Sequence, residues 1–166
     1  MFRLCFALAL ACTATLPIQA HAGHQHTHGH ASSTASPATA PQGISVDGCW
    51  IRAMPVQVPS GGYFVVRNAS EHAMQLTGIA TPAFGQTMLH QTVHQDGMAR
   101  MMHIDAVDIP AKGELAFQPG SYHAMLEQAA VDLTPGNTVA MTFLFGDKGQ
   151  VQADCELRSP ASLGGH

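Results

Sequence analysis

QTMLHQTVHQDGMARMMHIDA, residues 86–106, is the stretch that decides the fold. It contains two short alternating runs separated by Asp96-Gly97. An Asp-Gly pair between such runs strongly indicates a β-hairpin, because both central positions of the favoured two-residue turn need positive φ. With this turn, Gln95 opposes Met98, Thr92 opposes Met101, and His90 opposes His103. The stretch therefore predicts two antiparallel strands in a fixed register.

The register divides the hairpin side chains between two faces, because successive residues of a strand point to opposite sides. One face is apolar and is expected to pack on a core; it carries Leu89, Val93, Met102 and Ile104. The other face carries Met88, His90, Thr92, His94, Met101 and His103. On this second face His90 and Met101 are diagonal neighbours, roughly 7 Å apart at the backbone, which is within reach of long side chains.

The chain from Ile44 onward predicts further short strands and no sustained helical period. The expected strands are 44–54, 62–68, 74–79, 86–94, 99–106, 114–118, 122–127, 137–144 and 149–157. Turn-forming residues such as Pro119-Gly120 and Pro135-Gly136 separate them. Many short strands with regular turns favour an all-β fold, an antiparallel sandwich or Greek-key barrel. The last long run is apolar on both faces, so Val139, Met141, Phe143 and Phe145, or the alternate set, should line the core.

Two imidazoles and two thioethers recur at defined spacing: His90, ten residues, Met101, twenty-one residues, then His123-Ala124-Met125. Thioether sulfur selects Cu(I) over harder divalent ions, and imidazole accepts either copper state. His123 and Met125 share one face of their expected strand. A lone Met in a β protein is more often a core residue, and a lone His a surface residue. Met101, however, lies opposite the apolar face, so this set predicts a metal site.

The pattern His90-x10-Met101-x21-His123-x-Met125 matches the motif of the PCu(A)C family of periplasmic copper chaperones, and the chain resembles that family over roughly residues 44–158. The flanks agree: Trp50-Ile51-Arg52-Ala53-Met54-Pro55 is similar to its W-x-R-x-x-P opening, Gly62-Tyr63-Phe64 to its G-Y-F strand, and Pro119 to His123 to its P-G-x-Y-H turn.

This resemblance implies a cupredoxin-like β-sandwich with a surface Cu(I) site formed by His90, Met101, His123 and Met125. It also implies delivery of copper to respiratory oxidases, notably the binuclear site of cytochrome c oxidase. Many relatives carry a Met shortly after the first ligand His, where this chain has Gln91-Thr92-Val93-His94. His94 is therefore a candidate auxiliary ligand, and His103 is a second one.

The first residues predict export. Met1-Phe2-Arg3 is a short positive region, and an apolar run follows it to Ile18. Residues 1–22 fit a secretory signal peptide cleaved after Ala22, with Ala20 as the alternative, and the run is too short for a stable membrane span. Cys12 after Ala11 leaves a lipoprotein as a further alternative. We therefore expect a periplasmic protein.

Residues 23–43 form a histidine-rich tail and a linker. The tail imidazoles of His24, His26, His28 and His30 are suited to Cu(II), Ni(II) or Zn(II), although a solvated polar tail without such a role is the alternative. Residues 31–43 are small, polar and Pro-containing, which is typical of a disordered linker. Residues 44–158 are the expected copper-binding domain, and 159–166 a flexible C-terminal tail.

Two cysteines remain after the signal peptide, Cys49 and Cys155. An even pair in an exported chain predicts a disulfide, here between the first and last strands of the domain. The alternative makes them metal ligands, but neither has a C-x2-C or C-x-H neighbour that would favour this.

Composition excludes some classes of function. Charged residues make up 11% of the chain, the net charge is −4, and no basic patch supports nucleic-acid binding. The sequence contains no motif that pairs a nucleophile with a base or that places a general base, so it gives no indication of an enzyme. A blue-copper carrier needs a Cys ligand with a Met, and no Met follows Cys155. The family resemblance implies a chaperone that delivers Cu(I) to a respiratory oxidase copper subunit or its assembly factors, and we expect it to be monomeric and non-enzymatic. A periplasmic copper/zinc buffering or resistance protein is the alternative.

Overall fold

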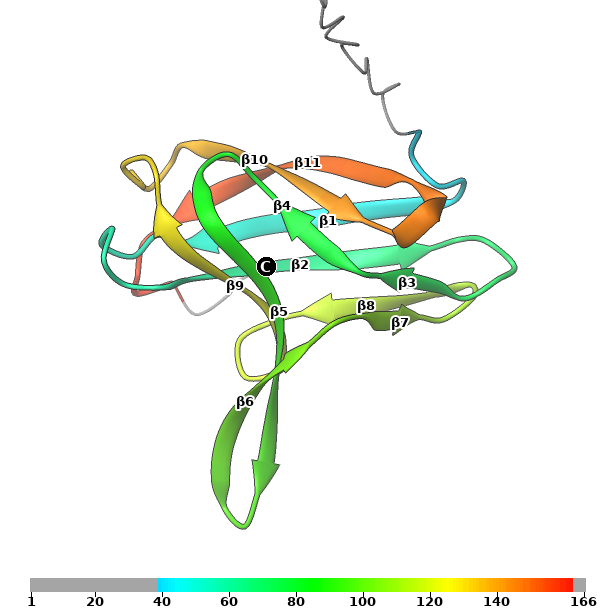
Figure 1. The fold of residues 1–166 in the computed structure, drawn as a ribbon, viewed down its shortest axis with the longest axis horizontal. Coiled ribbons are helices and arrows are strands. Elements are labelled where there is room, and N and C mark those ends of the chain that lie inside the picture. Colours follow the sequence, from blue (N-terminus) through cyan, green and yellow to red (C-terminus); the bar gives the residue numbers. More distant parts are fainter. Residues whose placement is uncertain (1–38, 163–166) are drawn as a thin grey trace, which may run out of the picture. The chain divides into compact units, whose positions relative to one another are not determined.

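The computed structural model describes residues 39–162, and these form strands with one short 3-10 helix (Figure 1). The expected signal peptide and histidine-rich tail lie outside the described residues, as do residues 163–166. The elements are β1 (Ile44–Arg52), β2 (Ser60–Asn68), β3 (Met74–Leu76), β4 (Gly78–Ala80), β5 (Phe84–Gln95), β6 (Met98–Ile104), β7 (Val107–Ile109), β8 (Gly113–Phe117), β9 (Tyr122–Ala129), β10 (Thr138–Leu144), η1 (Gly146–Lys148) and β11 (Gln150–Arg158). The predicted all-β class is confirmed.

Nine of these strands join in one sheet with the order β4-β10-β11-β1-β2-β8-β9-β5-β6, and β3 pairs with β7 separately. Strand β2 divides its partners: Ser60–Gly62 pairs with β9, and Phe64–Asn68 pairs with β8. This division brings β9, and β5 beside it, next to the start of β2. The later site residues come from this junction.

The sheet is mixed, whereas the sequence predicted purely antiparallel strands. β1 pairs with β11 in parallel, and β8 pairs with β9 in parallel. The β8–β9 contact is a single pair, Phe117 with Tyr122, at the turn that joins these strands. β1 and β11 are the first and last strands, so no turn between them fixes their direction. Their relative direction is therefore set by how the sandwich closes, which no local signal encodes.

The core is aromatic and aliphatic. Phe64 stacks on Phe117 with ring centres 4.2 Å apart and meets Phe143 edge-on at 4.7 Å. The predicted core set in and just after β10 is confirmed, since Val139, Met141, Phe143 and Phe145 are all buried. Burying a large apolar side chain stabilises the fold by about 1.5–3 kcal/mol, so this cluster is the main source of stability.

Cys49 and Cys155 form a disulfide between β1 and β11, as predicted. Cys49 lies at a register shift of β1 between Asp47 and Trp50, where Gly48 adopts a φ of +58°. A bulge of this kind re-aims side chains, and glycine tolerates the positive φ without steric cost. The bridge therefore ties together the two ends of the domain.

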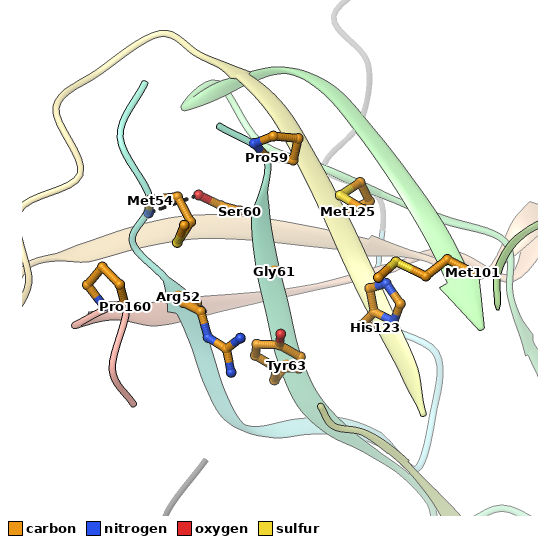
Figure 2. Close-up of a pocket in the computed structure, with 10 residues that line it drawn as sticks. All are labelled: Arg52, Met54, Pro59, Ser60, Gly61, Tyr63, Met101, His123, Met125 and Pro160. Carbon is orange, nitrogen blue, oxygen red and sulfur yellow. Dashed lines mark hydrogen bonds between the residues drawn. The ribbon is translucent and has the colours of Figure 1, made fainter. Parts of the chain in front are cut away.

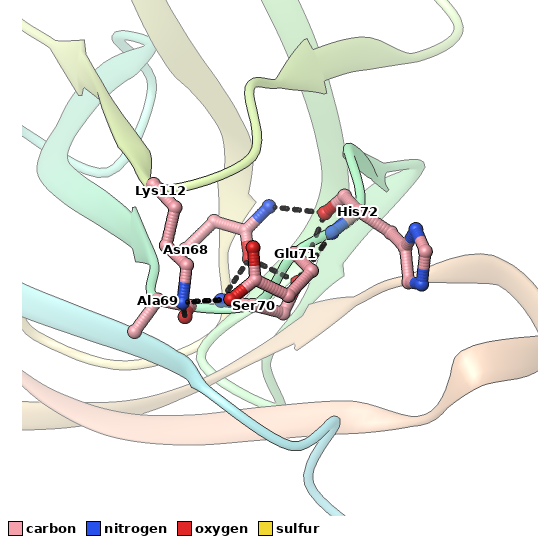
Figure 3. A network of polar contacts seen from close by, with 6 residues as sticks. All are labelled: Asn68, Ala69, Ser70, Glu71, His72 and Lys112. Atoms are coloured by element: carbon pink, nitrogen blue, oxygen red, sulfur yellow. Dashed lines mark hydrogen bonds and ion pairs between the residues drawn. The ribbon is translucent and has the colours of Figure 1, made fainter.

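A buried amide fixes the loop after β2 (Figure 3). The Asn68 side chain is 1% exposed, and its Nδ2 donates to the carbonyl oxygens of His72 at 2.8 Å and Ile109 at 3.3 Å. Its Oδ1 accepts from the backbone N–H of Ser70 at 3.0 Å and from the Ser70 hydroxyl at 2.6 Å. Lys112 Nζ closes the loop by donating to the carbonyl of Ala69 at 2.9 Å.

One expected strand is divided in the structure. Residues 74–79 were predicted as a single strand, but β3 pairs with β7 and β4 pairs with β10, with Thr77 between them. The Thr77 N–H and hydroxyl both donate to the carbonyl of Leu144, which anchors the crossover. Within residues 39–162, no helix is long and apolar enough to cross a membrane.

Candidate metal centre

The β5–β6 hairpin has the predicted turn and register. Asp96 and Gly97 have φ values of +52° and +76°, and Gln95 pairs with Met98, Thr92 with Met101, and His90 with His103. The hairpin projects away from the neighbouring strands (Figure 1). Strand β9 accompanies β5 only as far as Gln91, so the outer half of the hairpin has no third strand beside it.

This projection explains one wrong prediction. Leu89 is 2% exposed and Ile104 packs against the core, as the apolar face required. Met102 was placed on the same core face, but its side chain is 54% exposed. The predicted face of Met102 is correct, but the hairpin extends beyond the sandwich at this residue, so the core does not cover its side chain.

Strand β9 completes the site. It pairs with β5 so that His90 lies opposite His123 and Met88 lies opposite Met125. Because β6 places His103 opposite His90 on the other side, three imidazoles form a row across β6, β5 and β9. The ring centres of His90 and His123 are 5.7 Å apart, and those of His90 and His103 are 5.8 Å apart. Paired residues point to the same face of a sheet, so the whole row faces away from the core.

His123 is on this outer face and yet is only 7% exposed. Ala124 and Leu126 on the opposite face are fully buried in the core. The side chain of Met101 extends toward the His123 ring from β6 (Figure 2). His123 Nδ1 lies 3.1 Å from the carbonyl oxygen of Ser121 and donates to it as the protonated ring nitrogen. Such a bond fixes the ring and leaves the Nε2 lone pair free for a metal ion.

His90, at the centre of the row, carries a buried Nδ1 with no hydrogen-bond partner among the described residues. Burial lowers the pKa of His90, the positive charges of His123 and His103 lower it further, and Glu127 raises it. The neutral imidazole is the form that binds a metal ion. A buried nitrogen without a partner costs free energy, and a bound cation would offset this cost.

Met101, His123 and Met125 line one open pocket (Figure 2). The rest of its lining comes from β1, the segment between β1 and β2, β2, and the segment after β11: Arg52, Met54, Pro59, Ser60, Gly61, Tyr63 and Pro160. Arg52 packs its guanidinium carbon 5.5 Å from the Tyr63 ring centre, and Arg52 Nη2 donates to the carbonyl of Ser162 at 3.2 Å. Burial raises the pKa of Tyr63, and the charge of Arg52 opposes this shift.

The sequence did not predict that Arg52 and Tyr63 line the pocket beside His123. Both residues stood in motifs that served only to establish the family resemblance. Trp50 and Tyr63 are paired across β1 and β2 with ring centres 4.4 Å apart, and this pairing could not be placed before the strand order was known.

The two auxiliary candidates on the hairpin occupy different surroundings. His94 is exposed and pairs with Ala99 near the tip. His103 is half exposed at 55%, and its Nε2 lies 3.3 Å from Asp105 Oδ1. His24, His26, His28 and His30 lie outside the described residues. Within residues 39–162, no three His, Cys, Asp or Glu side chains lie close enough to hold a metal ion together.

Comparison with known proteins identifies the family. Residues 44–157 match the family model described as "Putative lipoprotein LpqE-like", and the chain belongs to this family. The fold is that of PCuAC domains: the apo PCuAC domain of PmoF2 matches with a TM-score of 0.63 and 22% identity, covering 77% of this chain and 99% of that one. The predicted resemblance and the cupredoxin-like fold are thus confirmed.

Two further relatives extend the comparison. The solution structure of Cu(I)-loaded DR1885 from Deinococcus radiodurans matches with a TM-score of 0.58 and 26% identity, covering 79% of this chain and 87% of that one. The uncharacterized protein RP573 of Rickettsia prowazekii is 34% identical over 92 residues, which are 55% of this chain. The chain spans about half the length of this curated relative, 51%.

Proposed function

We propose that this protein is a copper chaperone that binds Cu(I) through His90, Met101, His123 and Met125. The observation that carries the proposal is the pairing of His90 with His123 at 5.7 Å between ring centres. Two imidazoles that bind one metal ion at about 2.0–2.1 Å have ring centres about 5–6 Å apart. The separation of the His90 and His123 rings therefore suits one shared ion.

The donor chemistry favours Cu(I). Met101 and Met125 line the same pocket as His123, so soft sulfur lies beside the imidazole pair. Thioethers favour Cu(I), and no carboxylate belongs to the set that would favour a harder cation. The Cu(I)-loaded form of DR1885, 26% identical to this chain, supports the same metal here.

The exposure of the site suits delivery rather than storage. Met101 is 64% exposed, so one ligand can be displaced from outside without unfolding the sandwich. We propose delivery in the periplasm, after removal of the signal peptide 1–22, to the copper subunit of a respiratory oxidase or its assembly factors. The protein acts by binding and transfer, and no catalytic step is assigned to it.

The tail histidines support a second role. His24, His26, His28 and His30 offer imidazole without sulfur, a set suited to Cu(II). A copper/zinc buffering or resistance protein without a client would use the same tail. Removing residues 23–43 separates the two: a buffer loses most of its metal capacity, whereas the proposed chaperone keeps one Cu(I) site.

The ligand assignment is tested by anaerobic Cu(I) titration of the exported chain against a competing chelator. Met101→Ala and Met125→Ala should each weaken Cu(I) binding by more than about tenfold, since each removes a direct ligand. Met102→Ala is the matched control, because it is also an exposed methionine of β6 but lies on the opposite face of the hairpin. Equal affinities in all three variants would rule out the proposed ligands.

Delivery is tested separately. The Cu(I)-loaded chain is mixed with the copper-free soluble domain of an oxidase copper subunit, and the copper is followed after the two are separated. Transfer of the ion supports the chaperone. Retention by the loaded chain, with high affinity and no transfer, supports the buffer instead.

A further inference from the structure

The histidine row is nearly symmetric about β5. On one side, β9 carries His123-x-Met125, and on the other side β6 carries Met101-x-His103. Each pair shares a face of its strand because its members are two residues apart. His90 lies directly opposite both histidines, His123 on β9 and His103 on β6. The site therefore contains one more imidazole than the proposed Cu(I) set uses.

The two neighbours of His90 are geometrically equivalent. The His90–His123 rings have centres 5.7 Å apart and planes at 78°, and the His90–His103 rings have centres 5.8 Å apart and planes at 83°. His103 and His123 lie on strands two steps apart, which places their backbones about 10 Å from each other. Because no three His, Cys, Asp or Glu side chains within residues 39–162 are placed to hold one metal ion, His90 can share an ion with either neighbour in this arrangement but not with both at once.

The surroundings of His103 prepare it as a ligand. Its Nε2 is 3.3 Å from Asp105 Oδ1, so the carboxylate holds the proton on Nε2 and leaves Nδ1 free. A histidine ligand oriented by a carboxylate is a common metal-site arrangement. His123 is oriented in the same manner by the carbonyl of Ser121. The two histidines differ in access: His123 is 7% exposed, and the His103 side chain is 55% exposed.

We propose that His90, Met101 and His103 form a second, outer Cu(I) position, and that copper leaves the protein through it. This inference rests on the proposed function. Cu(I) moves outward by exchanging the His123 imidazole and the Met125 thioether for the His103 imidazole, while His90 and Met101 stay bound. The charge of the ion does not change, so no electron donor or acceptor is needed. The outer position presents the ion on the exposed hairpin, where an acceptor can reach it.

The experiment measures the rate of Cu(I) transfer from the loaded, exported chain to excess bathocuproine disulfonate under anaerobic stopped flow. His103→Ala should slow the transfer by about tenfold, since it removes a ligand of the outer position, and should leave the Cu(I) affinity of the inner position unchanged. His94→Ala is the matched control: His94 is an exposed histidine of the same hairpin, but it pairs with Ala99 and not with another imidazole. It should transfer at the wild-type rate.

A second measurement isolates the outer position at equilibrium. Met125→Ala weakens the inner position, and the Cu(I) that remains should be bound through His103. The double variant Met125→Ala/His103→Ala should lose this residual binding, and Met125→Ala/His94→Ala should keep it.

The inference is overturned if His103→Ala transfers copper at the wild-type rate, or if His94→Ala slows it equally, because any hairpin imidazole would then serve. These failures differ from a failure of the proposed function. If Met125→Ala binds Cu(I) as tightly as the wild type, the ligand set itself is wrong. If Met125→Ala weakens binding and His103→Ala changes no rate, only the outer position is wrong.

Discussion

The sandwich and the β5–β6 hairpin bury the same residue types to very different extents. In the sandwich, Phe64, Phe143 and Met141 are 2% exposed or less, and a disulfide joins the first and last strands. On the hairpin, Met101 is 64% exposed, and Met98 and Met102 are each 54% exposed. The same residue type is therefore core filler in one region and free thioether in the other. The difference teaches that the point where β9 stops pairing with β5 decides which hairpin methionines the sandwich leaves exposed, and that the face of the strand then separates Met101 from Met102.

The largest expected effect tests the sandwich. Replacing Cys49 and Cys155 together by serine should destabilise the domain by about 4–5 kcal/mol, because the bridge closes a loop of 106 residues in the unfolded chain. Urea unfolding monitored by Trp50 fluorescence measures this loss. The folded fraction should still bind one Cu(I), since neither cysteine belongs to the histidine row. Loss of Cu(I) binding by folded protein would show that the two regions are coupled.

Methionine truncation compares the two regions directly. Met141→Ala should cost about 2–5 kcal/mol, because the side chain is 1% exposed and leaves a cavity in the core. Met102→Ala should change the free energy of unfolding by less than about 0.5 kcal/mol, as is usual for an exposed position. Chemical denaturation of both variants gives the comparison. Similar losses would mean that the hairpin packs against something in solution.

A smaller loss is expected at the loop after β2. Asn68→Ala should destabilise by about 1–3 kcal/mol, because it leaves the carbonyls of His72 and Ile109 and the N–H of Ser70 without their partner. Cu(I) affinity should be unaffected. Asn68→Asp serves as the control of similar shape: it keeps the acceptor for Ser70 but loses the amide donor. An unchanged midpoint for Asn68→Ala would show that water replaces the amide without cost.

The smallest effect concerns acid. Since burial lowers the pKa of His90 in the folded protein, the unfolded chain binds a proton at His90 at a higher pH than the folded chain does. The free energy of unfolding of the copper-free protein should therefore fall as the pH drops below about 6.5, the ordinary histidine value, until His90 also titrates in the folded state. His90→Gln should flatten this dependence. If the free energy of unfolding of the variant depends on pH as steeply as that of the wild type, a group other than His90 causes the acid sensitivity.

The features of the fold and of the candidate site that depend on short stretches of sequence could be predicted. Asp96-Gly97 fixed the hairpin register, and with it the opposition of His90 and His103. The expected signal peptide and the remaining pair of cysteines predicted the bridge between β1 and β11. Alternation predicted that Val139, Met141, Phe143 and Phe145 share the core, because a strand has period two.

The rest depended on which strands become neighbours. The pairing of β9 with β5 brings His123 beside His90. These two strands are not consecutive in the chain, so no single turn predicts their pairing. The exposure of Met102 followed from the length of β9, and the division of residues 74–79 followed from a change of partner at Thr77. Sequence periodicity gives the face of a residue, but it does not show how far its neighbours extend.

X-ray absorption at the copper edge of the chain without residues 1–22, loaded with one Cu(I) under anaerobic conditions, tests the central claim most directly. The account predicts sulfur and imidazole nitrogen together in the first shell, with sulfur scattering reduced by Met125→Ala and unchanged by Met102→Ala. A first shell of nitrogen alone, or one that Met125→Ala leaves unchanged, would contradict the account, because the copper would then be bound away from the pocket that Met101, His123 and Met125 line.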